Sequence, residues 1–434
     1  MSAALDKAIA FLKAYAMDYT DIDIDTTVAL FLEEMEKGLS EQPGSLQMIP
    51  TYIEIHDRIP VNEPVIVLDA GGTNFRVAVV SFDKEKQPRI EQQTQFSMPG
   101  IGKEISRKEF FRTIVSYMEK VADAGDKIGF CFSYPTEILP SKDGKVLHFS
   151  KEIKVRDVEG HLIGENLAAA LTAHGFSGKK RIVLLNDTVT TLLAGTSLLE
   201  HKSYGSYVGF ILGTGTNCCY IEKNRNIKKT PGLDPEGSQI INVESGGFNR
   251  IACGKLDERF DQGTKIPSRF PFEKMHSGAY FGPLCKVVLK TAADDKLFSA
   301  RTGEALSALG EFDTKDVSDF LHLPCGDNML AGAAANEDDR GLLYLVLERM
   351  VERSAKLAAI ALSAAVLKSG AGEDPCRPVC ISAEGSTFFG MKNLKFGTKY
   401  YLKEYLREKK RRHTEIVSIK NATIIGAALA GLTN

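Results

Sequence analysis

The sequence predicts an α/β fold made of two related halves with a ligand cleft between them. Three observations lead to this prediction. Apolar strands alternate with helical segments along most of the 434 residues. An apolar strand that enters a glycine-rich turn occurs twice, once in each half. Polar residues follow the carboxyl ends of apolar strands, where open α/β sheets bind ligands. The length allows two or three domains with ample core.

The elements are expected in a simple order. Residues 1–60 read as helical. The next strands are expected at 65–82 (a hairpin), 127–135, 181–187, 205–222 (a second hairpin) and 378–383. Helices are expected at 108–124, over most of 256–370, and at 421–432. Asp21–Asp25 ("DIDID") has alternating carboxylates, but Thr26 stands where a calcium loop requires glycine, so a helix start is expected there.

Composition argues against several classes of partner. A net charge of −2 gives no reason to expect nucleic acid or an anionic membrane. The basic cluster Arg407–His413 could be a nucleic-acid patch, but the interspersed Glu404 and Glu408 favour a solvated helix face. No apolar run reaches the roughly 18 residues of a membrane span. Leu357–Leu367 is alanine-rich and predicts a buried helix.

The N-terminus and the cysteines indicate a reducing compartment. The first residues lack the basic start of a signal peptide, so a cytoplasmic location is expected. The eight cysteines form no CxxC pair of the kind that binds zinc. Buried free thiols are therefore expected.

The first glycine turn interrupts the strand pattern of Val65–Phe82. Gly71 and Gly72 break the run, Asp69 precedes them, and Thr73 and Asn74 follow. A plain hairpin requires glycine, but it does not require the flanking Asp, Thr and Asn. A structural turn and a ligand-binding turn both remain open from this segment alone.

The second turn repeats the first. In Tyr207–Glu222 an apolar strand enters Gly213–Thr216, and Asn217 follows. Successive amides of such turns form an anion nest, and glycine lets a phosphate approach the backbone. Neither a P-loop nor a G-x-G-x-x-G motif is present, which weighs against a dinucleotide fold. A third turn, Gly385-Ser386, follows a strand and opens a helix, so it is another candidate for anion or nucleoside contact.

An acid–base candidate lies at the end of another strand. "RIVLLNDTV" places Asn186 and Asp187 at the carboxyl end of an apolar strand, with Thr188 opening a helix. Asp187 could cap that helix. In a phosphoryl transferase it could instead accept the proton of an attacking hydroxyl. The polar groups at the other strand ends favour the second interpretation.

Taken in order, the motifs resemble those of the hexokinase family, in the superfamily of sugar kinases, actin and heat-shock ATPases. They are "LDAGGTNFRV", "SYP…SK", "LLNDTV", "GTGTNCCYIE", "NVESGGF", "EKMHSGAYFG" and "AEGSTFF". The resemblance runs from about residue 60 to the C-terminus. It implies a two-domain actin-like (ribonuclease-H-like) fold with the ligand cleft between the domains. The small domain would be 62–187 plus 421–434, and the large domain 1–61 plus 188–420.

The resemblance also implies an activity, the transfer of the γ-phosphoryl group of ATP to the 6-hydroxyl of a hexose, glucose first, with Mg²⁺. The catalytic residues would be Asp187, as general base, and Lys151. The substrate-binding residues would be Ser133, Pro135, Ser150, Lys151, Asn186, Asp187, Asn217, Glu244 and Glu273. The nucleotide-binding residues would be Asp69, Gly71, Gly72, Thr73, Asn74, Gly213, Thr214, Gly215, Gly385 and Ser386, with Asp69 reaching Mg²⁺ through water.

Other interpretations stay open. A non-catalytic sugar sensor on the same fold is the first alternative, and a kinase with a different phosphate donor is the second. Either a monomer or a homodimer is compatible with the sequence. The chain departs from the family pattern at Ser150 (usually Thr), Ser245 (often Trp) and Glu384 (usually Asp). The last segment keeps only Gly426 of the usual glycine-rich turn, and the zinc motif of the bacterial repressor-and-kinase glucokinases is absent.

Overall fold

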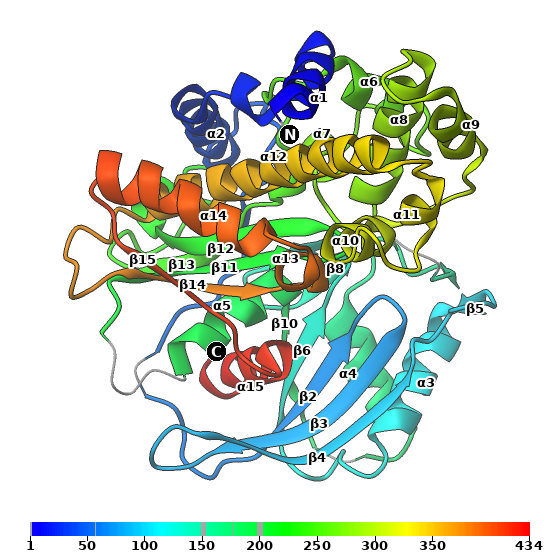
Figure 1. Ribbon diagram of the computed structural model, residues 1–434. Helices are drawn as coiled ribbons and strands as arrows, with labels where there is room; N and C mark the ends of the chain where they lie inside the picture. Colours follow the sequence, from blue (N-terminus) through cyan, green and yellow to red (C-terminus); the bar gives the residue numbers. More distant parts are fainter. Residues whose placement is uncertain (1, 57, 148, 150–152, 177, 198–202) are drawn as a thin grey trace.

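The computed structural model describes residues 2–56, 58–147, 149, 153–176, 178–197 and 203–434. Two mixed sheets dominate it (Figure 1). The smaller sheet has the order β10-β6-β2-β3-β4. Its strands are β2 (Val65–Ala70), β3 (Asn74–Phe82), β4 (Pro88–Ser97), β6 (Lys127–Phe132) and β10 (Arg181–Leu185).

The larger sheet has the order β1-β13-β12-β11-β14-β15. Its strands are β1 (Ile49–Pro50), β11 (Ser206–Leu212), β12 (Thr216–Lys223), β13 (Ser238–Asn242), β14 (Val379–Glu384) and β15 (Thr414–Val417). In each sheet an antiparallel hairpin, β2–β3 or β11–β12, is continued by a parallel strand, β6 or β14. This shared topology confirms the internal repeat that the two glycine turns predict.

Two small sheets and the helices complete the fold. The remaining strands pair as β5 (Ile105–Ser106) with β9 (Val155–Arg156), and β7 (Thr136–Ile138) with β8 (Gly144–Val146). The α-helices are α1 (Ser2–Ala14), α2 (Ile24–Leu39), α3 (Arg107–Met118), α4 (Ile163–Ala173), α5 (Asp187–Ser197), α6 (Lys255–Gln262), α7 (Pro271–Lys274), α8 (Phe281–Asp294), α9 (Ala300–Ala308), α10 (Thr314–His322), α11 (Met329–Ala333), α12 (Glu337–Ser369), α13 (Ser386–Gly390), α14 (Leu394–Leu402) and α15 (Ala422–Thr433).

Two predicted helices deserve comparison with the observed ones. The acidic run before residue 26 is a helix start, as expected, because the Asp23 carboxylate caps α2 by accepting from the Thr26 amide at 2.7 Å. The helix expected over 108–124 is too long. It ends at Met118, whose carbonyl accepts the amides of both Val121 and Ala122 at 2.8 Å and so turns the chain.

Helix α15 joins the two halves. It packs beside α5 and against β6 and β2, between the two sheets (Figure 1). The approach is backbone to backbone: a Cβ on Gly129 would lie 1.8 Å from the Ala427 carbonyl oxygen, and one on Gly426 would lie 1.9 Å from that of Thr190. A core cluster of α5, α15 and both sheets therefore fixes the base of the cleft. The expected boundaries at 187 and 421 stay a prediction.

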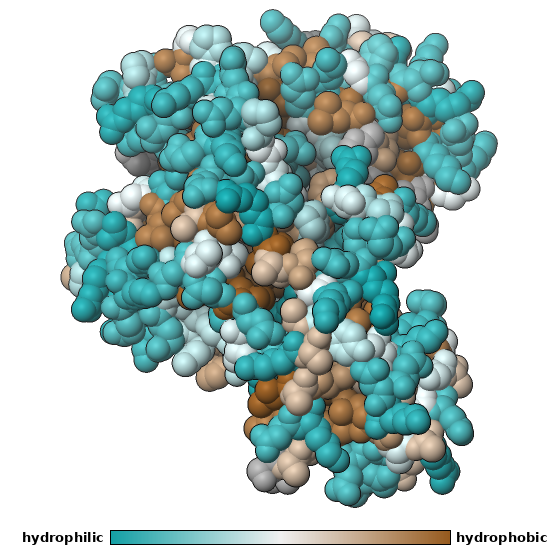
Figure 2. All heavy atoms as spheres, turned by 90° about the horizontal axis from the view of Figure 1, so that it is seen from above, coloured by the Kyte–Doolittle hydropathy of each residue, from teal (hydrophilic) through white to brown (hydrophobic). Residues whose placement is uncertain are grey.

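The face seen in Figure 2 is largely hydrophilic, with brown hydrophobic atoms in separate patches. Among the described helices, none is long and apolar enough to cross a membrane. The segment Leu357–Leu367 lies in the buried part of α12, as expected. All eight cysteines are free, but the expectation that they are buried holds for only five, because Cys253, Cys325 and Cys376 are exposed.

Candidate active site

The first glycine turn connects β2 to β3. The Gly71 amide donates to the Asn74 carbonyl at 3.0 Å, and the Tyr134 hydroxyl donates to the Gly71 carbonyl at 2.5 Å. Thr73 and Asn74 are exposed at this end of the smaller sheet. The Asn74 side-chain oxygen accepts from Gln95. The turn therefore exposes the side chains of Thr73 and Asn74. Hydrogen bonds accepted by the carbonyls of Gly71 and Asn74 stabilise its backbone.

Asp69 supports this turn from inside the sheet. It is buried and forms an ion pair with Arg76, its cross-strand partner on β3. Thr423, at the start of α15, donates to Asp69 and accepts from Arg76 at 3.0 Å. Burial raises the pKa of Asp69, while the Arg76 charge opposes that rise. The C-terminal helix thus contributes directly to the first turn.

The second turn, between β11 and β12, is clamped by two other segments. The Gly213 carbonyl accepts from the Gly278 amide at 2.7 Å and from the Thr387 hydroxyl at 3.0 Å, and the Thr214 carbonyl accepts from the Ala279 amide. The third turn lies directly beside it. A Cβ on Gly385, whose φ is +120°, would lie 2.1 Å from the Leu212 carbonyl oxygen. Only glycine fits at position 385.

Asn186 and Asp187 lie at the junction between β10 and α5. The Asn186 side-chain oxygen accepts from the Thr188 amide at 2.9 Å, so Asn186 supplies the helix cap. The Asp187 carboxylate is half-buried and bonds to the Thr188 hydroxyl at 3.3 Å. Capping of α5 therefore does not explain why an aspartate stands at position 187.

The Glu244 carboxylate is held by two asparagines. Asn242 donates to its Oε1 at 2.8 Å and Asn217 approaches the same oxygen at 3.4 Å. Asn217 also donates to Asn242 at 2.7 Å and accepts the amides of Cys218 and Ser245. Both ends of the Asn217 side chain are thus engaged within the protein. Asn217 orients Glu244, a role that its sequence position does not reveal.

Glu244 is both strained and electrostatically perturbed. Its φ is 57°, a left-handed conformation that residues other than glycine seldom adopt. Burial raises its pKa to about 7, although the Asn242 hydrogen bond opposes this, and the charges of Asp187 and Glu273 raise it further. Perturbed carboxyl groups in such positions are typical of functional sites.

Glu273, on α7, connects Glu244 to the second turn. Its Oε2 accepts from the Thr216 amide at 3.0 Å, and a Cβ on Gly215 would lie 2.6 Å from that oxygen. A Cβ on Gly246 would also lie only 3.1 Å from the Cβ of Glu273. The glycines at 215 and 246 therefore make room for Glu273 beside the turn.

Glu384 is the remaining carboxyl group of this cluster, at the end of β14. Burial raises its pKa to about 7, and the charge of Asp187 adds to the rise while that of Arg76 opposes it. The structure thus gathers carboxylates from five separate segments around one region. The members of this carboxylate cluster are Asp69, Asp187, Glu244, Glu273 and Glu384.

Two pockets open on this region. One, of about 210 Å³, is lined by Pro135, Asn186, Asn242 and Glu244 together with Arg269 and several apolar side chains. The other, of about 440 Å³, is lined by Thr214 and Ser386 together with residues of α10 and Gly278. Three of the predicted sugar residues and two of the predicted nucleotide residues thus line separate neighbouring cavities.

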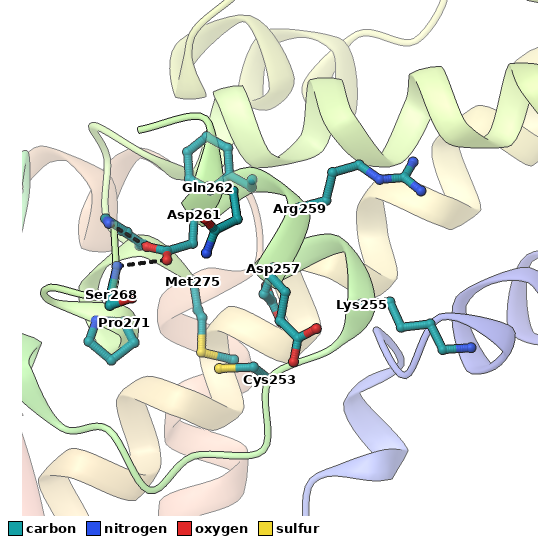
Figure 3. A pocket seen from close by; sticks show the side chains of 12 residues that line it. Cys253, Lys255, Asp257, Arg259, Asp261, Gln262, Ser268, Pro271 and Met275 are labelled. Carbon is teal, nitrogen blue, oxygen red and sulfur yellow. Dashed lines mark hydrogen bonds and ion pairs between the residues drawn. The ribbon is translucent and has the colours of Figure 1, made fainter. Parts of the chain in front are cut away.

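A larger pocket, of about 520 Å³, contains none of the predicted residues (Figure 3). Three of its charged side chains are engaged within the protein: Asp261 accepts from Lys274 at 2.5 Å and from the Ser268 amide, and Asp257 pairs with the buried Arg353. These pairs stabilise the junction of α6, α7 and α12. The carboxylate cluster, and not this larger pocket, is the candidate active site.

Not every predicted residue is placed. Ser150 and Lys151 lie outside the described residues. Ser133 follows β6 and donates its amide to the Ala70 carbonyl at 3.2 Å, next to the first turn. Sequence reasoning missed Asn242, Arg76 and Thr423. Asn242 stands two residues before Glu244 and Arg76 two after Asn74, so same-face spacing in the strands was the available signal.

The chain is similar to hexokinases in both sequence and structure. Two family models, both described as hexokinase, match residues 12–197 and 207–433. Human hexokinase-2 is 28% identical over 399 residues, which are 86% of this chain and 43% of that protein. Mouse hexokinase HKDC1 is 32% identical over 323 residues, 70% of this chain and 34% of that protein. The chain therefore spans less than half the length of these curated relatives.

Solved structures agree on the fold. A Schistosoma mansoni hexokinase complexed with glucose superposes with a TM-score of 0.78 at 23% identity, covering 100% of this chain and 99% of that one. A ROK hexokinase from Thermus thermophilus gives a TM-score of 0.52 at 17% identity, covering 85% of this chain and 97% of that one. The expected two-domain actin-like α/β fold is confirmed.

Proposed function

The chain belongs to the hexokinase family, and from this premise we propose that it transfers the γ-phosphoryl group of ATP to the 6-hydroxyl of a hexose, with glucose the first candidate. One observation carries the proposal most strongly. Asp187, whose cap role is taken by Asn186, belongs to the same carboxylate cluster as Asp69, which precedes the first glycine turn, and Glu273, which binds the second. Such an arrangement suits a base that acts between a polyol and a phosphate. The glucose in the Schistosoma mansoni complex supports the choice of sugar.

In the proposed reaction, Asp187 accepts the proton of the attacking 6-hydroxyl. The Glu244 carboxylate accepts sugar hydroxyls, and Asn217 and Asn242 hold it in place. Glu273 and the Asn186 amide group complete a pocket that reads several hydroxyls at once, the way polar sites reject incomplete analogues. Lys151 and Ser150, outside the described residues, are proposed as further sugar contacts, with Lys151 near the transferred group.

The residues at the turns fit a nucleotide. Glycines at 213, 215 and 385 leave the backbone open to a phosphate, and Thr214 and Ser386 line the larger of the two neighbouring pockets. Among the described residues no group of three or more His, Cys, Asp or Glu could hold a metal alone. Mg²⁺, which would neutralise phosphate charge when bound, is therefore proposed to reach Asp69 through water. Arg76 holds the Asp69 carboxylate in position for that contact.

We also propose the domain division at 62–187 plus 421–434 and 1–61 plus 188–420. The glycine turns then face the cleft from opposite domains, so bound sugar favours a closed state over an open one. Closure would exclude water, the competing nucleophile. Addition of glucose alone should decrease the radius of gyration in small-angle scattering. An unchanged radius, together with rapid sugar-independent ATP hydrolysis, would contradict this gating.

The test of the proposed function is a coupled assay of ADP release across glucose, mannose, fructose, galactose and N-acetylglucosamine. We expect turnover with at least one hexose. Sugar binding without turnover would support the sugar sensor instead. Turnover only with pyrophosphate or polyphosphate in place of ATP would support a kinase with another donor.

A further inference from the structure

Helix α14 has one face in the core and one in solvent. Gly397 lies against α12, because a Cβ there would sit 2.8 Å from the Cβ of Ala355. The Thr398 hydroxyl contacts the Ala355 carbonyl at 3.4 Å, and Leu394 and Leu402 are buried on the same side. This packing fixes the rotation of the helix. Residues 395, 396, 399 and 400 consequently point away from the core. Lys403, which directly follows α14, is exposed as well.

That outward side carries large aromatic residues. Phe396 is 76% exposed and Tyr400, one turn later, is 51% exposed. Phe389, on the preceding α13, is 38% exposed. Most large apolar side chains of the described residues are buried, so three exposed aromatics within twelve positions form an unusual concentration. Figure 1 shows α14 on the outside of α12, with no further helix or strand over it.

Lysines surround these aromatic rings. Lys395, Lys399 and Lys403 form no ion pair among the described residues, and the Lys395 ammonium lies 4.8 Å from the centre of the Phe389 ring. Between residues 392 and 412 the chain has nine basic residues and two acidic ones, although its net charge is −2. We call Lys395, Phe396, Lys399, Tyr400 and Lys403 the α14 face.

The basic residues beyond α14 differ from those of the α14 face. Lys409 and Lys410 pair with Asp25, and Arg412 pairs with Glu373 at 2.8 Å. These pairs attach the end of the basic segment to the protein. The lysines of the α14 face have no such pair among the described residues, so their charge is available to a partner, with Glu404 as the nearest acid in the sequence.

We propose that the α14 face docks onto the surface of an anionic lipid bilayer. Aromatic rings prefer the boundary between acyl chains and headgroups, and flanking lysines extend along apolar surface to reach anionic headgroups. Both features lie on one convex helix surface, whereas single-stranded nucleic acid is usually bound in a groove with stacking platforms. The proposal does not depend on the kinase activity. It revises the expectation, drawn from net charge alone, that no membrane is involved.

Vesicle sedimentation tests the proposal. Phosphatidylcholine vesicles with phosphatidylserine should retain the protein, phosphatidylcholine alone should not, and added salt should release it. The triple variant Lys395→Glu, Lys399→Glu, Lys403→Glu should lower binding by about 100-fold, since each lysine contributes about fivefold near an anionic surface. The double variant Phe396→Ser, Tyr400→Ser should lower it by about tenfold or more.

Two control variants carry the same kinds of substitution at exposed positions outside the α14 face. Lys84→Glu, Lys103→Glu, Lys179→Glu makes the same charge change at exposed sites of the smaller half. Leu323→Ser removes a side chain that is 68% exposed and lies outside α14. Neither control should change vesicle binding beyond a factor of about two, and all variants should keep the thermal transition of the parent.

Four results would overturn the proposal. The first is an equal loss of vesicle binding in the Lys84→Glu, Lys103→Glu, Lys179→Glu control, which would show that net charge alone causes the binding. The second is retention of vesicle binding in both α14 variants. The third is a dimer, detected by light scattering, that the Phe396→Ser, Tyr400→Ser variant dissociates, which would assign the face to a second copy. The fourth is binding of single-stranded RNA that displaces the vesicles and needs the same residues, which would reassign the face to nucleic acid.

Discussion

The two glycine turns have similar sequences and different supports. In the first turn Asn74 points outward, and the buried carboxylate behind it, Asp69, pairs with Arg76. In the second turn Asn217 points inward and binds Asn242 and Glu244. No cation lies within ion-pair distance of Glu244 among the residues that the structure describes. One turn is thus charge-balanced, and the other carries an uncompensated carboxyl group.

This difference suggests a division of labour. A charge-balanced, outward turn can meet an anionic phosphate without repelling it, because Arg76 offsets Asp69. An uncompensated, well-oriented carboxylate is suited to neutral hydroxyl groups, which donate hydrogen bonds. The repeated sequence pattern therefore sets the backbone of each turn, and the partners from distant segments set which part of the substrate each can recognise.

The largest expected effect concerns Asp187, the proposed base between the sugar and the phosphate. Asp187→Asn keeps the shape of the side chain and removes the base, so kcat should fall by about 10²-fold or more with sugar affinity nearly unchanged. Steady-state kinetics and calorimetry of glucose binding provide the two measurements. Asp123→Asn, at an exposed site on another segment, is the control. A near-normal kcat would remove Asp187 from the proposed mechanism.

A second experiment compares the turns directly. Gly215→Ala places a Cβ 2.6 Å from the Glu273 carboxylate, whereas the nearest atom to a Cβ at Gly71 is the Asn74 carbonyl oxygen at 3.2 Å. We expect Gly215→Ala to weaken sugar binding by about tenfold or more and Gly71→Ala to leave it within about threefold. Calorimetry with glucose gives both values. Equal losses would show that the turns are not specialised as proposed.

The fold was largely predictable because strand and helix periodicities are local. The hairpins at β2–β3 and β11–β12, the strands β6, β10 and β14, and helix α15 all follow from apolar patterns bounded by glycine or polar residues. The end of α3 was not predictable, because the turn after Met118 depends on backbone hydrogen bonds that the side chains do not indicate. Exposure of three cysteines likewise depends on packing, which the sequence does not show.

The site was predictable in its ligand-facing residues and less so in its supports. Asn186, Asp187 and Glu244 stand at strand ends in recognisable motifs. Thr423 matters only through a contact made over a long sequence separation, with Asp69 from 354 positions away. Asn242 is close to Glu244 in sequence, but its contact with Asn217 spans 25 positions. The resemblance suggested that Asn217 contacts sugar, but its side-chain atoms are engaged with other parts of the protein. Whether it also contacts substrate stays a prediction.

The support of the second turn can be tested at Asn242. Asn242→Leu removes the hydrogen bond that favours the ionised form of Glu244, so the pKa of Glu244 should move upward from about 7. We expect sugar affinity to fall by about tenfold and its pH midpoint to rise. Affinity titrations from pH 6 to 9 measure both. Asn74→Leu, the equivalent change near the first turn, should leave the midpoint in place. A lower affinity with an unmoved midpoint would indicate general damage to the pocket.

The smallest expected effect concerns stability and follows from the uncompensated charge. Burial raises the pKa of Glu244 from its ordinary value of 4.5 to about 7 in the folded protein. Between these values the folded state holds a proton that the unfolded state has released. The contribution of Glu244 to stability is therefore greatest below pH 4.5, declines as the pH rises, and is lost above about pH 7.

Glu244→Gln replaces the carboxyl group with a permanently neutral side chain of nearly the same shape. Its Tm should equal that of the parent near pH 4.5 and exceed it by a few degrees at pH 8, although sugar binding is weakened. Calorimetric scans at the two pH values, with the exposed Glu41→Gln as control, give the difference. If Glu244→Gln lowers Tm equally at both pH values, then Glu244 is not an uncompensated carboxylate, and the proposed contrast with Asp69 and its Arg76 partner would fail.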